Sequence, residues 1–249
     1  MRITLIGYGA MGRLIRELAE QKGHEVVLTC RSPQVSVGER SSSSAAPQLT
    51  HGLPERERLA ACDVAIDFTS GDAVRANVEA CMAAGIPLVE GTTGWSDERA
   101  GVESIVRECN GALVFGANFS VGVNLFYRVA EFAAELFAKF PEYEAFIEEQ
   151  HHSRKKDAPS GTALKLKEII SRYVDKEFSV SATRAGNIPG THRVGFDGPA
   201  DQILLEHTAR SREGFAAGAL MAAEWIVGKK GFYEFTDIID KVISDTKRI

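Results

Sequence analysis

The sequence has no excess of positive charge and no long hydrophobic run. Its 249 residues include 29 lysines and arginines against 34 aspartates and glutamates, a formal net charge of −5 at pH 7. A general nucleic-acid-binding protein needs a basic excess to neutralise phosphates, so we expect no nucleic-acid partner. The apolar runs, including the one at the start of the sequence, are too short for a signal peptide or a membrane span. We therefore expect a cytoplasmic protein with no membrane partner.

Paired cysteines and metal-binding motifs are also lacking. The four cysteines are scattered, form no CxxC pair and all lie in the first half of the chain: Cys30, Cys62, Cys81 and Cys109. This pattern argues against a disulfide framework and against a zinc site. No HExxH motif occurs, and two adjacent histidines on a strand would point apart. The sequence therefore predicts that no metal takes part.

Short apolar runs alternate with helical patterns as far as Gly116. The strand candidates are Arg2–Gly7, 24–30, Asp63–Phe68, Ile86–Gly91 and Ala112–Gly116. Helical patterns lie at Gly12–Gln21 and Ala73–Ala83, and from about Ser96. Apolar strands that alternate with helices predict an α/β fold with a Rossmann-type, doubly wound parallel sheet. The Ser-rich stretch 32–48, which includes Ser41–Ser44, predicts a mobile surface loop.

The pattern changes after Asn118 and predicts a second, α+β domain. A long amphipathic helix at 123–140 precedes a strand at 142–152, a helix from Ser160 to about Tyr173, and strand-like pieces at 178–185, 192–198 and 202–210. This order predicts a mixed or antiparallel sheet. The segments 214–228 and 232–243 return to a helical pattern, which we expect to pack on the first domain. We thus predict a dinucleotide-binding domain over 1–120 and 214–249, and a second domain over 121–213.

A glycine-rich loop joins the first predicted strand to the first predicted helix. The stretch "IGYGAMG" sets Gly7, Gly9 and Gly12 in GxGxxG spacing. The first glycine permits a tight turn, the second a close approach to a pyrophosphate, and the third a close helix–strand contact. Because the motif follows a strand and opens a helix, it predicts dinucleotide binding rather than a simple turn. The predicted cofactor loop consists of Gly7, Tyr8, Gly9, Ala10, Met11 and Gly12.

The end of the second predicted strand lacks the acidic residue that would hold the 2′-hydroxyl of NADH. The stretch "LTCRS" offers Arg31 and Ser32 instead, which suit a 2′-phosphate. We therefore predict NADPH as the preferred cofactor, with NADH as the alternative. The competing interpretation is that Arg31 stacks on adenine or stays solvated. Further cofactor contacts are expected at strand ends, from Thr69, Gly91–Gly94 and Gly116–Ser120.

A basic stretch, "HHSRKKDAPSGTA", precedes a predicted helix start at Ser160. Ser160 is a good N-cap, and Gly161 with Thr162 would offer N–H groups and a hydroxyl to an anion. The stretch supplies five basic side chains just before this point: His151, His152, Arg154, Lys155 and Lys156. Together they favour a small carboxylate ligand over a solvated charged loop with an ordinary helix cap.

Hydride transfer to a C=N or C=C bond leaves negative charge that must be protonated. A histidine of this stretch, with a lysine nearby, suits that role because histidine titrates near neutral pH. Two further histidines, His192 and His207, lie on predicted strands, where either is as well explained as an ordinary core or surface residue.

These motifs together resemble the 4-hydroxy-tetrahydrodipicolinate reductase family, long called dihydrodipicolinate reductases. The resemblance covers nearly the whole chain and rests on "IGYGAMGR", "IDFT", "GTTG", "NFSVGVN", "HHSRKKDAPSGTA" and "LEHTARSREGFAAGAL", which occur in the family's order. It implies reduction of the cyclic imine 4-hydroxy-tetrahydrodipicolinate to tetrahydrodipicolinate by NAD(P)H, in diaminopimelate and L-lysine biosynthesis. It also implies a homotetramer built through the sheet of the second domain, which would then serve both substrate binding and oligomerisation.

Residue roles follow from the same resemblance. His151 matches the family's proton donor and Lys155 its catalytic lysine. His152 matches a substrate-binding histidine, and Gly161 with Thr162 matches the pair that binds a carboxylate. Besides the glycine loop, the matched cofactor positions are Gly91, Thr92, Thr93, Gly116, Ala117, Asn118 and Phe119.

The sequence departs from the family pattern in two places. Many members have GxxGxMG, one residue longer than the loop here, and many have Glu-Arg where this chain has Cys30-Arg31. Loss of the acid favours NADPH. Two other functions compete with the reductase: another two-domain NAD(P)-dependent oxidoreductase, such as an amino-acid dehydrogenase, and a non-enzymatic NAD(P)-sensing protein. Neither has a reason to carry "KxDAPSGTA", so the reductase is our prediction.

Overall fold

The computed structural model describes residues 1–31, 48–52 and 55–245. It divides into two compact units: unit 1 comprises Met1–Ser120 and Phe215–Ile249, and unit 2 comprises Val121–Gly214. The Ser-rich stretch for which the sequence predicts a mobile loop, with Ser41–Ser44, lies outside the described residues except for its last position. Within the described part, no helix combines the length and the apolar composition that a membrane crossing requires.

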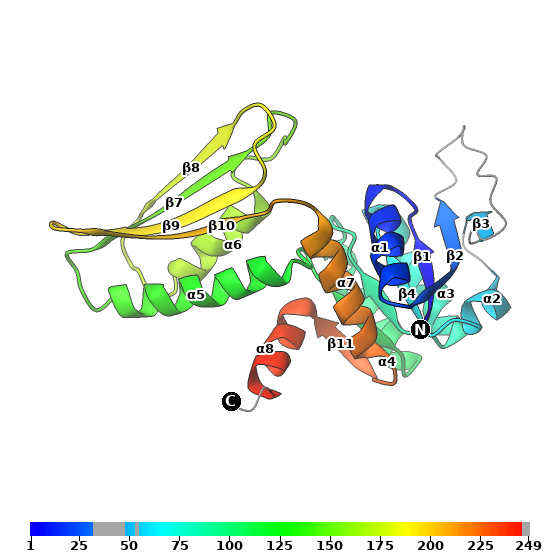
Figure 1. The fold of residues 1–249 in the computed structure, drawn as a ribbon. Helices are drawn as coiled ribbons and strands as arrows, with labels where there is room; N and C mark the ends of the chain where they lie inside the picture. Colours follow the sequence, from blue (N-terminus) through cyan, green and yellow to red (C-terminus); the bar gives the residue numbers. More distant parts are fainter. Residues whose placement is uncertain (32–47, 53–54, 246–249) are drawn as a thin grey trace. The chain divides into compact units, whose positions relative to one another are not determined.

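Unit 1 is built on a parallel sheet of Rossmann type (Figure 1), as the sequence predicts. Its strands are β1 (Arg2–Ile6), β2 (Glu25–Arg31), β3 (Gln48–His51), β4 (Val64–Asp67), β5 (Leu88–Glu90), β6 (Ala112–Phe115) and β11 (Gly231–Glu234). They lie in the order β11-β6-β5-β4-β1-β2-β3, and every pairing is parallel. The order reverses at β1, where such a sheet opens its ligand-binding crevice at the carboxyl ends of the strands.

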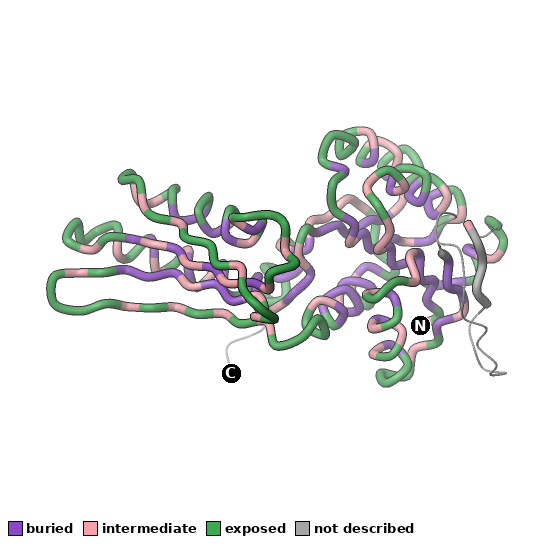
Figure 2. The backbone as a smooth tube through the Cα atoms, turned by 90° about the horizontal axis from the view of Figure 1, so that it is seen from above, coloured by how far each residue is buried: buried purple, intermediate pink, exposed green. Residues whose placement is uncertain are grey.

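The central strands of unit 1 are buried along their whole length. Every residue of β4, β5 and β6 is buried, and so are the last four of β1 (Figure 2). Burial on both faces explains why these segments read as continuous apolar runs and not as alternating ones. The flanking elements are α1 (Ala10–Gln21), α2 (Arg56–Ala60), η1 (Gly71–Ala73), α3 (Val74–Ala84), η2 (Ser96–Glu98), α4 (Arg99–Glu108), α7 (Glu213–Ile226) and α8 (Phe235–Asp245).

The structure corrects the predicted elements in two places. The segment 232–243 was expected to be helical throughout, but Gly231–Glu234 forms β11 and the helix α8 begins only at Phe235. The aromatic residues favour a strand here: β11 pairs with β6, and Phe232 stacks on Phe115 with ring centroids 4.7 Å apart. The strand β3 and the short helix α2 were not predicted, because β3 follows directly on the Ser-rich stretch and α2 spans only five residues.

Unit 2 places two helices against a mixed sheet, as predicted. Its elements are α5 (Val121–Phe137), β7 (Glu144–His151), α6 (Gly161–Ile170), β8 (Ser179–Arg184), β9 (Thr191–Asp197) and β10 (Gln202–Thr208). The strand order is β10-β9-β7-β8, with β7 parallel to β8 and antiparallel to β9. Burial alternates along β7, so Ile147, Glu149 and His151 face the same side as the apolar core. This alternation brings polar side chains to the inner face at the end of the strand.

Candidate active site

The glycine loop of unit 1 has the backbone geometry that the GxGxxG spacing predicts. Gly7 has φ +90°, and a Cβ there would lie 2.3 Å from the carbonyl oxygen of Phe68. A Cβ on Gly12 would lie 2.3 Å from the carbonyl oxygen of Gly7. By contrast, no atom lies within 4 Å of a Cβ built on Gly9, which is the N-cap of α1. The first turn of α1 carries no acidic residue, so the open position and the helix N-terminus suit a pyrophosphate.

Two loops at the carboxyl edge of the sheet are joined by hydrogen bonds. The backbone N–H of Thr69, after β4, donates to Oγ1 of Thr92, after β5, at 3.0 Å. The N–H of Thr92 donates to Oε1 of Glu90 at 2.8 Å, and Nδ2 of Asn77 donates to Oγ1 of Thr69 at 3.1 Å. The predicted cofactor positions Gly91, Thr92 and Thr93 thus belong to a loop in which hydrogen bonds to Thr69 and Glu90 hold Thr92.

A buried pair of carboxyl groups lies beneath these loops. Asp67 and Glu90 end adjacent strands in register, and both are 0% exposed. Burial raises the pKa of Asp67, and burial together with the charge of Asp67 raises the pKa of Glu90 well above its ordinary range. Nδ2 of Asn77 donates to Oδ2 of Asp67 at 2.5 Å, while Oδ1 of Asp67 and Oε2 of Glu90 are buried and have no hydrogen-bond partner within the described residues. The raised pKa values favour the protonated form at this pair, and most strongly at Glu90.

The remaining predicted cofactor positions lie at the ends of β2 and β6. Arg31 ends β2, and its side chain lies outside the description. Gly116, Ala117 and Asn118 follow β6, and Oδ1 of Asn118 accepts a hydrogen bond from the N–H of Ser120 at 2.9 Å. Phe119 is only 2% exposed, in an aromatic group with Phe68 and Phe235, so its ring supports the loop instead of facing solvent.

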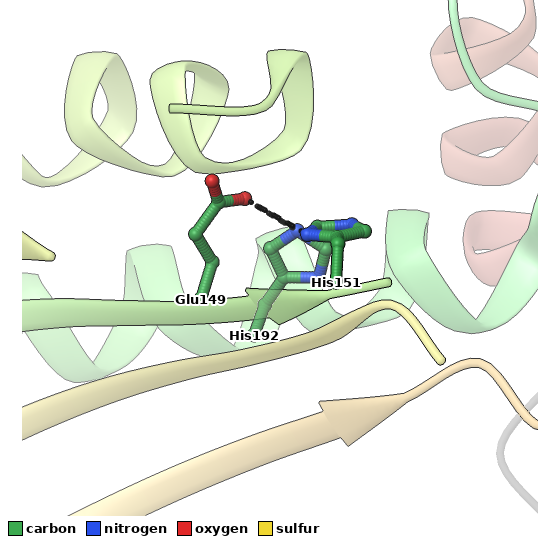
Figure 3. A group of neighbouring side chains, drawn as sticks. All are labelled: Glu149, His151 and His192. Atoms are coloured by element: carbon green, nitrogen blue, oxygen red, sulfur yellow. Dashed lines mark ion pairs between the residues drawn. The ribbon is translucent and has the colours of Figure 1, made fainter. Parts of the chain in front are cut away.

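In unit 2, His151 lies at the end of β7 in a cluster of buried polar side chains. Its Nδ1 is 3.4 Å from Oε2 of Glu149, and Nε2 of His192 is 3.5 Å from the same oxygen. The side chains come from neighbouring strands and point toward one another (Figure 3). The rings of His151 and His192 meet edge to face with centroids 5.1 Å apart.

The other oxygen of Glu149 has two strong donors. Its Oε1 accepts from Nη2 of Arg184 at 2.6 Å and from the N–H of Ser160 at 2.9 Å. Burial alone would raise the pKa of Glu149, but the hydrogen bonds from Ser160 and Arg184 outweigh burial and lower it. Glu149 is therefore an ionised carboxylate in a buried place, with Arg184 as its countercharge.

The two histidines of the cluster have lowered pKa values, which favours their neutral forms. Burial lowers the pKa of His151, and Lys155 and Arg184 lower it further, although Glu149 acts in the opposite direction. Burial and the neighbouring His151 lower the pKa of His192 to about 4. His192 is thus neutral near pH 7, and the His151 imidazolium releases its proton more readily than an ordinary histidine.

The helix start predicted at Ser160 has the expected cap. Ser160 is the N-cap of α6, and its Oγ accepts from the N–H of Ala163 at 3.2 Å. Gly161 is exposed, with no atom within 4 Å of an added Cβ, so a ligand has room beside the first turn. Thr162 hydrogen-bonds with the phenol of Tyr127, whose pKa is raised chiefly by burial. This open helix N-terminus suits a carboxylate.

The basic residues beside this helix are held by a turn. The N–H of Lys155 donates to the carbonyl of His152 at 3.1 Å, and Nζ of Lys155 lies 2.8 Å from Oδ1 of Asp157. Nη1 of Arg154 donates to Oδ1 of Asn187 at 2.9 Å. In unit 2, Glu149 thus lies between His151 and the Ser160 cap, and the charge of Lys155 acts on His151.

Three residues of the cluster were not predicted. Glu149, Arg184 and His192 meet because β7 pairs Glu149 with His192 on one side and His151 with Arg184 on the other. The position of Glu149, two residues before His151, was a usable signal, since residues i and i+2 share a strand face. Within the described residues, Glu149, His151 and His192 are also the one group spaced to hold a metal ion. Because Arg184 already neutralises this carboxylate, we interpret the group as a buried carboxylate with two neighbouring histidines and not as a set of metal ligands.

The chain matches the dihydrodipicolinate reductase family in both of its parts. The N-terminal family region matches residues 1–119 and the C-terminal region residues 122–239. The chain belongs to this family. A 4-hydroxy-tetrahydrodipicolinate reductase of Christiangramia forsetii is 34% identical, covering 98% of this chain and 100% of that protein. Another, from Archaeoglobus fulgidus, is 35% identical over 96% of this chain and its own full length.

Solved structures show the same fold. A dipicolinate-bound dihydrodipicolinate reductase from Paenisporosarcina superposes with a TM-score of 0.76 at 23% identity, covering 96% of this chain and 99% of that one. A DAP dehydrogenase from C. glutamicum has a TM-score of 0.55 at 12% identity and covers 99% of both chains. The predicted reductase is confirmed by family membership: an oxidoreductase that uses a nicotinamide cofactor in diaminopimelate and lysine biosynthesis.

Proposed function

We propose that unit 2 binds the dicarboxylate substrate and protonates it through His151, assisted by Lys155. The observation that carries this proposal is the cluster at the end of β7, where a buried histidine of lowered pKa is tied through Glu149 to the cap of an open helix N-terminus. His152, Gly161 and Thr162 would hold the substrate carboxylates there. The ligand is small and anionic, in keeping with the basic residues that surround this helix start.

The proton step follows from the charges around His151. In the absence of ligand its pKa is lowered by burial and by Lys155, so little imidazolium is present at neutral pH. A bound dicarboxylate adds negative charge nearby and raises that pKa, which loads the proton only when substrate is present. The 4-hydroxyl group of the substrate must leave as water, the hydride goes to the ring carbon, and protonation of the reduced ring by His151 returns the imidazole to its neutral form.

We further propose that unit 1 binds the cofactor and that NADPH is preferred. The residues that would hold it are Gly7, Tyr8, Gly9, Ala10, Met11, Gly12, Arg31, Gly91, Thr92, Thr93, Gly116, Ala117, Asn118 and Phe119. The open position at Gly9 and the acid-free N-terminus of α1 support this assignment. The chemistry that a bound NADPH supplies is a hydride. The absence of an acid beside Arg31 supports NADPH over NADH.

The assembly is a further part of the proposal. We expect a cytoplasmic homotetramer formed through the sheet of unit 2, with unit 1 as the cofactor domain and unit 2 as the substrate and oligomerisation domain. The division of the chain into two compact units at 120/121 and 214/215 supports separate roles.

The experiment is a coupled assay in which the preceding synthase makes the unstable substrate from pyruvate and aspartate semialdehyde. The wild-type protein should oxidise NADPH with a higher kcat/KM than NADH. His151→Gln should lower kcat by about 10²–10⁴-fold and Lys155→Met should also lower it, while the Kd for NADPH stays unchanged. Lys165→Met, on the exposed face of α6, is the matched control and should leave both values unchanged.

Two results would contradict the proposal. No turnover with either nucleotide, despite measurable cofactor binding, would leave a sensing protein or another dehydrogenase. Full turnover of His151→Gln would leave the reductase in place but remove His151 as its proton donor.

A further inference from the structure

Glu149 is a buried charge that the proposed chemistry does not use directly. It is 1% exposed and lies on the inner face of β7, two residues before His151. One oxygen is bound by Arg184 and by the N–H of Ser160, while the other faces His151 and His192 (Figure 3). Removing an ionised group of this kind from water is costly, so a sheet position that retains one calls for an explanation.

We propose that Glu149 is the positioning residue of the active site. It holds Nδ1 of His151, leaves Nε2 as the nitrogen that delivers the proton, and ties this ring to the helix N-terminus that binds the substrate. The proposal rests on the proposed function of His151 and extends it to residues that do not touch the substrate.

The two nitrogens of His151 have different surroundings. Within the described residues, Nδ1 is buried and makes no hydrogen bond, and Oε2 of Glu149, which also makes none, lies 3.4 Å from it. Nε2 lies beside Gly190, where a Cβ would come within 3.1 Å of it. The lack of a side chain at Gly190 therefore leaves Nε2 open to a reacting group. An ionised Glu149 can only accept, so the neutral ring carries its proton on Nδ1.

The charges around the ring fit a positioning role. Glu149 raises the pKa of His151, but burial, Lys155 and Arg184 lower it, and Asp157 acts weakly in the direction of Glu149. Because Arg184 binds the carboxylate directly, Glu149 orients the imidazole without making it strongly basic. A ring held in this way stays acidic enough to give up its proton at neutral pH.

The same carboxylate reaches the substrate side of the site. Oε1 of Glu149 accepts from the N–H of Ser160, whose Oγ caps the N–H of Ala163 and lies 3.1 Å from Nε2 of His192. A displacement of Glu149 would therefore move both the ring of His151 and the first turn of α6. One side chain thus sets the distance between the proton donor and the carboxylate-binding turn.

The test replaces Glu149 by glutamine, which keeps its volume and can still accept from Ser160. Its amide would donate to Nδ1, which forces the neutral ring of His151 to carry the proton on Nε2. We expect kcat to fall about 10²–10⁴-fold, while KM for the substrate and Kd for NADPH change by less than about threefold. Loss of the negative charge lowers the pKa of His151, so kcat/KM should fall off at lower pH than in the wild type.

The matched control is Glu148→Gln, one position away on the opposite face of β7, where Glu148 pairs with Arg193 at 3.6 Å. It should change none of these values. A Glu149→Gln enzyme with wild-type kcat and an unchanged pH profile would overturn the proposal.

A second measurement needs no variant. In ¹⁵N-histidine NMR of the wild-type protein, the neutral ring of His151 should show its proton on Nδ1. A proton on Nε2 would overturn the proposal even if Glu149→Gln fails to fold. This readout is also independent of turnover, so absence of reductase activity in the wild type would count against the proposed function and not against the arrangement around Glu149.

Discussion

Each unit of the molecule buries carboxyl groups, and the two sets behave in opposite ways. Asp67 and Glu90 in unit 1 are 0% exposed, and Glu149 in unit 2 is 1% exposed. Burial raises the pKa of Asp67 and Glu90, whereas the pKa of Glu149 is lowered although burial acts on it in the same direction. Burial is therefore not what decides the charge of a carboxyl group in this protein.

The difference lies in the donors that each carboxyl meets. Asp67 and Glu90 face each other and receive hydrogen bonds from neutral groups, the amide of Asn77 and the N–H of Thr92. Glu149 receives a backbone N–H and the guanidinium of Arg184. Neutral donors leave the pKa of Glu90 raised, whereas the guanidinium of Arg184 keeps Glu149 ionised, so that Glu149 can only accept from the imidazole of His151. Each unit thus has the kind of carboxyl that its proposed task needs.

Removal of the Arg184 cation should have the largest effect on stability and should abolish the difference between the two sets of carboxyl groups. In Arg184→Met, Glu149 loses its countercharge in a buried place, which should cost about 3–5 kcal/mol of unfolding free energy. The folded-state pKa of Glu149 would then lie above its ordinary value, so stability should fall as the pH rises from 5 to 8. In the wild type the lowered pKa of Glu149 has the opposite effect, because its contribution is lost only as the pH falls. Urea unfolding at both pH values, at one protein concentration, measures the difference.

The control for this prediction is an arginine–glutamate pair of similar length at the surface. Nη2 of Arg172 lies 2.7 Å from Oε1 of Glu168, with half of each side chain exposed. Arg172→Met should cost no more than about 1 kcal/mol, with little dependence on pH. Equal losses in the two variants would show that burial adds nothing to the Arg184–Glu149 pair.

Removal of a neutral hydrogen-bond donor should lower the free energy of unfolding less than removal of a cation. Nδ2 of Asn77 donates to Asp67 and to Thr69, and Asn77 is 4% exposed. Asn77→Leu leaves a buried acceptor unsatisfied and should cost about 1–3 kcal/mol. Arg75→Ala, exposed on the same helix α3, is the control and should change stability by less than about 1 kcal/mol. An Asn77→Leu protein as stable as this control would mean that Asp67 does not need the amide.

The contrast between these sites also marks what the sequence can predict. The alternation of apolar runs and helical patterns was enough for the Rossmann-type sheet, and the Pro-Ser-Gly-Thr pattern was enough for the helix start at Ser160. The periodicity of a helix or strand is contained in a short stretch of sequence, so these elements can be predicted without knowledge of the fold. The edge strand β11 was missed because pairing with β6 overrides the helical pattern predicted from 232 onward.

The partners of Glu149 were beyond prediction for a different reason. Arg184 and His192 reach the site through the pairing of β7 with β8 and β9, and a register shifted by one residue would turn their side chains to the other face. Similarly, Asp67 and Glu90 meet because β4 and β5 end in register. Register depends on packing across the whole sheet, so these residues could be found only in the structure.

The smallest expected effect is that of a substitution in the buried carboxyl pair of unit 1. Glu90→Gln has the shape of the protonated acid and can donate to Asp67, so it should fold and stabilise the protein at neutral pH. The raised pKa of Glu90 means that its contribution to stability is present below about pH 4.5, its ordinary value, and is lost as the pH rises toward the folded-state pKa. Glutamine has no such loss, so the gain in Tm over the wild type should grow from pH 5 to pH 8. It should reach a few degrees, since about 1 kcal/mol corresponds to about 2–4 °C in a protein of this size.

Glu103→Gln, exposed on α4, is the control for this last prediction and should shift Tm equally little at both pH values. If Glu90→Gln instead lowers Tm at pH 8, Glu90 is ionised in the folded protein and Asp67 carries the proton. If its effect is the same at pH 5 and pH 8, the folded protein binds no more protons at Glu90 than the unfolded chain does over this range. Either result would remove the contrast with Glu149, because Glu90 would then be ionised in the folded protein although only neutral groups donate to it.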